Sequence, residues 1–81
     1  MKYVVINVCD REIKKVGVTS TSAEAIEIMK NDFMNVFTKH YNKVDFENEV
    51  DRCNEWNLYE KDAWLHTNSD HNYDWTIIEV E

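Results

Sequence analysis

The chain has 81 residues, of which 43% are hydrophobic, and its formal net charge is −7. A chain of this length forms a single domain, and its three Trp, four Tyr and three Phe offset the small size because each can bury about 150–250 Å². No apolar run approaches the roughly 18 residues of a membrane span, and the first residues alternate like a strand, so we expect neither a membrane segment nor a secretory signal.

The acidic residues are concentrated in the second half of the chain. Residues 1–43 carry seven Lys/Arg and five Asp/Glu, a net charge of +2. Residues 44–81 carry only two Lys/Arg but eleven Asp/Glu, a net charge of −9. A segment this negative repels nucleic acid and anionic membranes, and it attracts basic surfaces over a Debye length of about 8 Å. The charge distribution therefore argues against direct binding to nucleic acid or membrane and predicts a protein partner with a basic surface.

The two cysteines, Cys9 and Cys53, are too few for a disulfide scaffold and lack the C-x-x-C spacing of a metal or redox motif. We therefore predict two reduced thiols in a cytoplasmic protein.

The chain begins with two predicted strands. Residues 2–9 are rich in β-branched side chains and have two apolar faces, which indicates a central position in a sheet. These faces carry Val4, Ile6 and Val8 on one side and Tyr3 and Val5 on the other. After a polar turn, residues 13–19 form a second strand, where Gly17 marks a bulge or a close backbone approach.

A long helix is predicted to follow, from Thr21 to about Tyr41. The sequence Thr21-Ser22-Ala23-Glu24 is a capping box, in which the threonine oxygen accepts from the amide three residues later. Apolar residues recur at spacings of three and four, the pattern of one helix face. This stripe consists of Ile26, Met29, Phe33, Val36 and Phe37.

Residues 44–55 fit two structures. Residues 44–51 alternate like a strand, with Val44, Phe46 and Val50 opposite four acidic residues. However, Phe46, Val50 and Cys53 also fit a helix stripe, and Asp45 is a good N-cap. We slightly favour a short helix.

Two further strands complete the predicted fold. Residues 58–67 form a strand that is broken near residues 60–62, residues 68–74 form a polar loop, and residues 75–80 form the final strand, paired with the preceding one as a hairpin. The predicted fold class is α+β, an antiparallel sheet of three to four strands packed on one long helix. The expected order is β-β-α-(short α or β)-β-β.

The motifs that would carry chemistry are incomplete. Residues 70–74 match D-x-N-x-D and Glu81 stands at the twelfth position of an EF-hand loop, but Trp75 replaces the required glycine. His66, Asp70 and His71 have no nearby cysteine to complete a structural zinc site. A single glycine cannot build a phosphate-binding loop. We predict no enzymatic activity, no cofactor and no metal site.

The candidate binding site is the acidic segment from residue 45 to residue 62. Its carboxylates cluster in either a strand or a helix, and regularly spaced carboxylates imitate a row of phosphates. The alternative interpretation is an ordinary solvated acidic face, which keeps a small protein soluble. The residues predicted to attract the partner are Asp45, Glu47, Glu49, Asp51, Glu55 and Glu60, with Trp56 and Tyr59 as the apolar anchor.

The chain also resembles small uncharacterised acidic α+β proteins of bacterial genomes, prophages and other mobile elements. The similarity consists of Ala25-Ile26-x-x-Met29 in the helix, Ala63-Trp64, and the closing Asp74-Trp75-x-Ile77-x-Glu79. This resemblance implies no activity, ligand or functional residue. It implies a context, because small acidic proteins of mobile elements include inhibitors of host restriction and CRISPR nucleases.

Together these patterns predict a non-enzymatic, macromolecule-binding protein whose acidic second half engages a basic surface. A nucleic-acid-mimicking inhibitor of a nucleic-acid-binding protein, of the anti-restriction or anti-CRISPR type, is the specific form of this hypothesis. The alternative is a structural or assembly protein that self-associates through an exposed strand edge.

Overall fold

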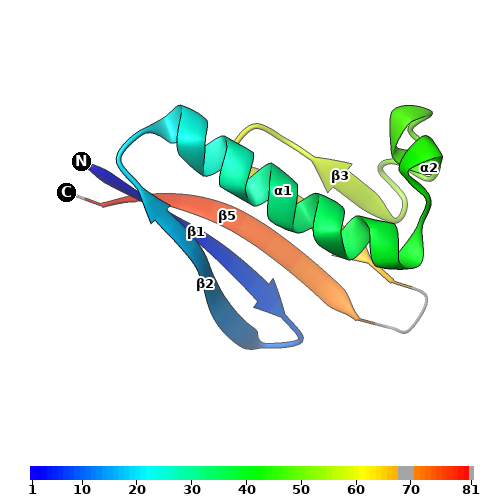
Figure 1. The fold of residues 1–81 in the computed structure, drawn as a ribbon. Helices are drawn as coiled ribbons and strands as arrows, with labels where there is room; N and C mark the ends of the chain where they lie inside the picture. Colours follow the sequence, from blue (N-terminus) through cyan, green and yellow to red (C-terminus); the bar gives the residue numbers. More distant parts are fainter. Residues whose placement is uncertain (68–70, 81) are drawn as a thin grey trace.

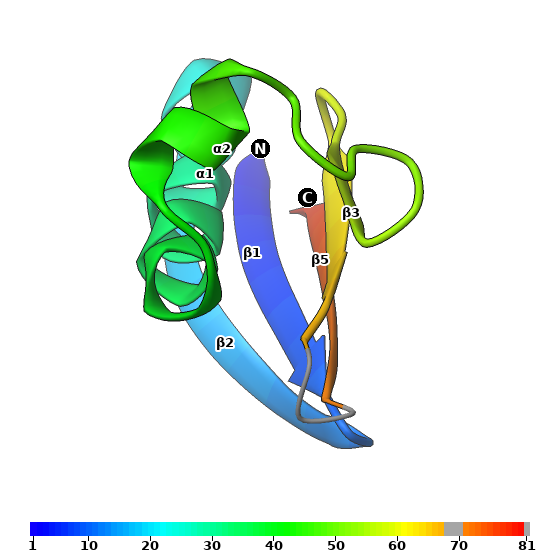
Figure 2. The same ribbon diagram turned by 90° about the vertical axis from the view of Figure 1, so that its right-hand side faces the viewer.

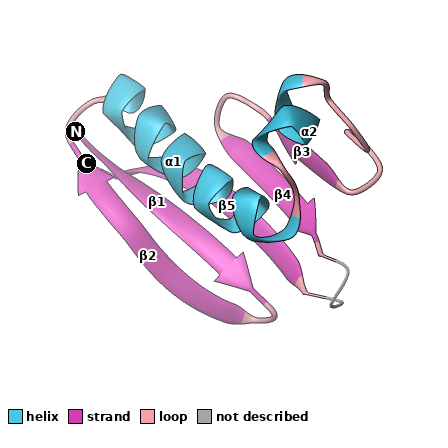
Figure 3. Cartoon of the chain, turned by 45° about the vertical axis from the view of Figure 1, so that its right-hand side comes forward, coloured by secondary structure: helices cyan, strands magenta, loops and turns pink. Residues whose placement is uncertain are grey.

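The computed structural model, which describes residues 1–67 and 71–80, has the predicted α+β fold (Figure 1). Its sheet is antiparallel throughout and has five strands in the order β2-β1-β5-β4-β3, rather than the expected three to four (Figure 3). The strands span Lys2–Cys9 (β1), Glu12–Thr19 (β2), Trp56–Leu58 (β3), Asp62–His66 (β4) and Asn72–Val80 (β5). The helices span Ser22–His40 (α1) and Lys43–Glu47 (α2).

The additional strand, β3, begins at Trp56, before the segment 58–67 that was predicted as one broken strand, and overlaps that segment only at Leu58. The break near residues 60–62 is a complete reversal of the chain, closed by a backbone bond of 2.8 Å in which the Tyr59 amide donates to the Asp62 carbonyl. Consequently, β3 and β4 pair with each other, and β4 also pairs with β5 as the predicted hairpin.

The β1–β2 hairpin has a two-residue turn, Asp10-Arg11. Both residues have positive φ, 49° and 77°, as the type I′ turn that matches the twist of a hairpin requires. Further along β2 the register shifts by one residue, which is the bulge predicted at Gly17. A Cβ on Gly17 would lie 3.2 Å from Cγ2 of Ile28, so the glycine also permits the close approach of α1.

Helix α1 begins as predicted, with the Thr21 side chain accepting from the Glu24 amide at 3.2 Å. Its buried residues lie at spacings of four, and they are Ala25, Met29, Phe33 and Phe37. The helix lies across one face of the sheet (Figure 2). Neither helix in the described part of the chain is long and apolar enough to cross a bilayer.

Aromatic rings make up much of the core between the helix and the sheet. The ring of Phe33 lies within 6.3 Å, centroid to centroid, of the rings of Phe37, Phe46, Trp56 and Trp75. These rings come from α1, α2, β3 and β5, so one cluster joins both helices to the sheet. Such clustering gives an 81-residue chain a substantial apolar core.

The segment after α1 is a short helix followed by irregular turns. The predicted short helix is confirmed for Lys43–Glu47, and the strand alternative is wrong. Asp45 is not the N-cap; that position is Asn42, whose amide donates to Oδ2 of Asp45 at 3.1 Å. Beyond the helix, Glu49 and Asp51 have positive φ, as does Cys53, so the chain turns repeatedly before β3.

Candidate functional site

The predicted acidic site residues do not form a regular row. Helix α2 ends at Glu47, and the positive φ angles of Glu49 and Asp51 interrupt any helical or strand-like repeat. The even spacing that would imitate a line of phosphates is therefore absent from this segment. The carboxylates are instead distributed over α2, the following turns, and the turn between β3 and β4.

Part of this negative charge gathers around Tyr41, at the end of α1. Burial, followed by the charges of Glu55, Asp51 and Asp45, raises the pKa of the Tyr41 hydroxyl. Three of the predicted acidic residues thus lie near one point on the surface, although they are not evenly spaced.

The other predicted residues line a groove between α1 and β3. Two hollows of about 240 Å³ and 230 Å³ share Lys30 and Leu58 in their walls, so they adjoin each other and together make up this groove. Five of the eight predicted residues contribute to its lining, namely Glu47, Glu49, Trp56, Tyr59 and Glu60. We call this depression the α1–β3 groove.

The groove has an apolar lining, and its walls carry three acidic residues together with the cations Lys30 and Arg52. Its apolar lining is contributed by Ile26, Met29, Phe46, Trp56 and Leu58, and its acidic residues are Glu47, Glu49 and Glu60. All three acidic residues are exposed, whereas the apolar residues are buried or partly buried. This combination suits an apolar side chain flanked by cations.

The two predicted anchors differ in burial. Trp56 is only 1% exposed because the rings of Phe33, Phe37 and Phe46 pack around it, and its indole N–H donates to the Val50 carbonyl at 2.7 Å. The prediction of Trp56 as an exposed anchor is therefore wrong. Tyr59 is 52% exposed and remains available for contact.

Arg52 is the cation most closely tied to the acidic residues. Its guanidinium forms an ion pair with Glu49, donates to Oδ1 of Asn57 at 3.2 Å, and lies 5.9 Å from the ring centre of Trp56. Within residues 1–67 and 71–80, no other predicted acidic residue has a cationic side chain within 4.0 Å. These remaining carboxylates are Asp45, Glu47, Asp51, Glu55 and Glu60.

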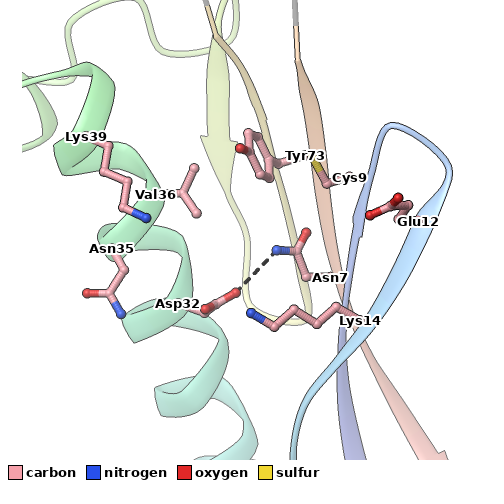
Figure 4. Close-up of a pocket in the computed structure, with 9 residues that line it drawn as sticks. All are labelled: Asn7, Cys9, Glu12, Lys14, Asp32, Asn35, Val36, Lys39 and Tyr73. Atoms are coloured by element: carbon pink, nitrogen blue, oxygen red, sulfur yellow. Dashed lines mark hydrogen bonds between the residues drawn. The ribbon is translucent and has the colours of Figure 1, made fainter.

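A larger, more polar pocket of about 420 Å³ lies between the C-terminal half of α1 and strands β1, β2 and β5 (Figure 4). Oδ2 of Asp32 accepts from Nε1 of Trp75 at 2.8 Å and from Nδ2 of Asn7 at 3.4 Å. Oδ1 of Asn7 is buried and has no hydrogen-bond partner among the described residues. Lys14 and Lys39 line the pocket and balance the charges of Glu12 and Asp32.

The thiol in this pocket is held in its protonated form. Burial raises the pKa of Cys9, and burial also raises the pKa of the neighbouring Tyr73 hydroxyl. Because the thiolate is the reactive form of cysteine, Cys9 is not activated as a nucleophile. Neither cysteine is in a disulfide within the described residues; Cys9 is partly buried and Cys53 is exposed.

The described residues include no group of three or more His, Cys, Asp or Glu that would hold a metal ion. Asp70 and Glu81, which belong to the incomplete calcium and zinc motifs, lie outside the described residues.

Sequence reasoning missed the opposite wall of the groove. Ile26 and Met29 were assigned to the helix stripe, and Lys30 was not assigned a role, yet all three line the groove. The helical periodicity identifies the apolar face of α1 but not the part of it that β3 leaves uncovered. The pocket around Asp32 was also missed, since its members come from four separate elements.

Comparison of the chain with protein-family models, with curated proteins and with solved structures finds no match.

Proposed function

We propose that this protein is a non-enzymatic binding module whose α1–β3 groove captures a basic segment of a partner protein. The observation that carries the proposal is the apolar lining of the groove, whose walls hold the exposed carboxylates of Glu47, Glu49 and Glu60 against the two cations Lys30 and Arg52. Carboxylates accelerate the encounter with a basic surface, and the apolar groove supplies the contact that retains it.

Different residues of the groove attract the partner and hold it. Glu47 and Glu60, at the two ends of the groove, have no cationic partner within the described residues and attract the partner. Tyr59 is the exposed aromatic contact, consistent with the frequent use of Tyr at interface hot spots. Leu58, shared by both hollows, supports the apolar centre.

The specific form of the proposal is a cytoplasmic inhibitor of a nucleic-acid-binding protein, of the anti-restriction or anti-CRISPR type. Its support is the net charge of −9 in residues 44–81 and the resemblance to acidic proteins of mobile elements. Inhibition would depend on occupying a basic cleft of the partner, since residues 45–62 present no evenly spaced row of charges that could copy a phosphate backbone.

A defined peptide tests the general proposal. A short fluorescent peptide with alternating Arg and Leu residues should bind the protein, and NMR shifts should map to Lys30, Leu58 and Tyr59. Binding should weaken steeply from low salt to about 1 M salt, where the Debye length falls to about 3 Å.

Matched charge reversals identify the surface involved. Glu47→Lys combined with Glu60→Lys should weaken peptide binding by about tenfold or more. The control, Glu12→Lys combined with Glu27→Lys, changes the net charge equally but lies outside the groove. Equal weakening by both double variants would show that net charge alone attracts the peptide and would contradict a groove-specific site.

The specific form needs a separate assay. Purified protein should inhibit DNA cleavage by at least one member of a panel of restriction and CRISPR nucleases, and excess duplex DNA should relieve the inhibition. Peptide binding without inhibition of any nuclease would leave the groove as a protein-binding site and refute the inhibitor role.

A further inference from the structure

The face of the sheet opposite α1 has no covering layer within the described part of the chain. Both helices lie on one side of the sheet, which leaves the other side bare apart from the turns that pass beside β3 (Figure 2). Four aliphatic side chains on this open face are exposed, by 75% for Ile13, 47% for Val18, 44% for Ile78 and 42% for Val80.

Strand register places these side chains next to one another. Val4 on β1 lies between Val18 on β2 and Ile78 on β5, and Val8 lies beside Ile13. Directly paired residues share a face of an antiparallel sheet, so these residues form a continuous apolar surface. We define the open face as Val4, Ile6, Val8, Ile13, Val18, Ile78 and Val80, with Trp64 at its β4 side.

The two edges of the open face carry opposite charges. One row across the sheet runs from Lys15 on β2 through Ile6 and Thr76 to Asp62 on β4. A second acidic residue, Asp74, lies on β5 in the neighbouring row. The open face is thus positive toward β2 and negative toward β4.

We propose that two copies of this chain pack open face to open face, about a two-fold axis that runs parallel to the strands between β1 and β5. A rotation about this axis keeps the position of each residue along the strands and reverses the order of the strands across the sheet, so each row of paired residues faces the same row of the other copy, run in the opposite direction. Lys15 of each copy then faces Asp62 of the other, and Val4 faces Ile78. Such self-complementarity is what a symmetric dimer interface requires.

The competing two-fold arrangement has poorer electrostatics. An axis perpendicular to the strands places β2 over β2, so that Lys15 meets the basic edge of the second copy.

Stacked sheets prefer an angle of about −30° and a spacing of about 10 Å. The flexible Lys15 side chain can span the resulting displacement from Asp62.

The size of the face sets the expected strength of the dimer. Strands β2, β1, β5 and β4 have 8, 8, 9 and 5 residues, and at about 3.4 Å by 4.8 Å per residue they cover about 500 Å² on each copy. The total of about 1,000 Å² is at the lower limit for a specific interface. We therefore expect a dimer with a dissociation constant in the micromolar range rather than a permanent one.

This surface differs from the strand edge predicted for self-association. The exposed edge β2 carries Lys14 and Lys15, and lysines on an edge strand oppose edge-to-edge pairing. The apolar area lies on the face rather than along the edge, which favours stacking of the two sheets.

Sedimentation equilibrium over a wide concentration range tests the dimer. The wild-type chain should dimerise, whereas Ile78→Asp should remain monomeric because it buries a charge opposite Val4. Circular dichroism should show that the variant is folded, since Ile78 is already 44% exposed. A wild-type chain that stays monomeric at millimolar concentration would overturn the proposal.

A charge-swap cycle tests the symmetry. Lys15→Asp and Asp62→Lys should each weaken dimerisation about tenfold, because each creates two like-charge contacts. The double variant should restore the affinity to within about threefold of wild type. Additive weakening in the double variant would refute the proposed axis. Lys39→Asp with Glu27→Lys, on α1, is the matched control and should have no effect.

The dimer and the binding groove are independent. The groove opens between α1 and β3, away from the open face, so the monomeric Ile78→Asp variant should bind the basic peptide as the wild type does.

Discussion

Asp32 should contribute strongly to stability because one carboxylate oxygen serves two donors. Oδ2 accepts from the indole N–H of Trp75 at 2.8 Å and from the side-chain amide of Asn7 at 3.4 Å. Trp75 is 1% exposed and Asn7 is 7% exposed, so water has little access to either side chain. Leaving a buried donor unpaired costs about 1–3 kcal/mol, and the 3.4 Å bond is the weaker of the two. Asp32→Leu should therefore lower the free energy of unfolding by about 2–4 kcal/mol.

Urea denaturation, followed by tryptophan fluorescence, measures this change. With a slope of about 1 kcal/mol per molar urea, the midpoint should fall by roughly 2–4 M, provided that the domain is stable enough to remain folded without denaturant. Asp32→Asn is the control, since its carbonyl still accepts from Trp75, and its cost should be about 1 kcal/mol. If Asp32→Leu unfolds within about 0.5 kcal/mol of wild type, the two hydrogen bonds do not stabilise the fold as argued.

Three further predictions concern the β1–β2 hairpin. Arg11→Gly should raise the free energy of unfolding by about 0.5–1 kcal/mol in thermal melts, because glycine adopts φ of 77° without steric cost; no gain would argue against the turn geometry. Gly17→Val should lower it by about 1–3 kcal/mol in urea titrations, because the added methyls press on Ile28, and a neutral effect would contradict the close approach. The hydrogen bond from His71 lowers the pKa of Asp10 below its ordinary value of 3.8, so this contribution to stability is present above that pH and lost as the pH falls through the lowered pKa. The difference in thermal midpoint between wild type and His71→Ala should therefore shrink in acid, and a difference that grows instead would refute the assignment.

Much of the fold could be predicted because its signals are local. The β-branched alternation of residues 2–9, the Thr21 cap and the helix stripe each depend on neighbouring residues. The structure confirms the strand and the cap, and of the stripe it buries Met29, Phe33 and Phe37, whereas Ile26 and Val36 are partly buried. The bulge at Gly17 was also predictable, since a lone glycine in a strand has few other uses.

The candidate site was only partly predictable. Charge segregation identified the acidic segment, and five of its eight predicted residues line the α1–β3 groove. Core packing is the usual place for a tryptophan, but the particular contacts that bury Trp56 come from Phe46 on α2 and from two rings on α1, which sequence spacing does not specify. Irregular φ angles at Glu49 and Asp51 likewise follow from how the chain reaches β3.

The amino-acid sequence by itself determined which side chains alternate, where the long helix starts, and which half of the molecule is acidic. Only the tertiary structure decided which apolar surfaces are covered. Both faces of β1 are apolar in the sequence, but a single long helix covers only the face that carries Val5. Alternation assigns a residue to a side of the sheet, whereas burial depends on whether another layer reaches that side.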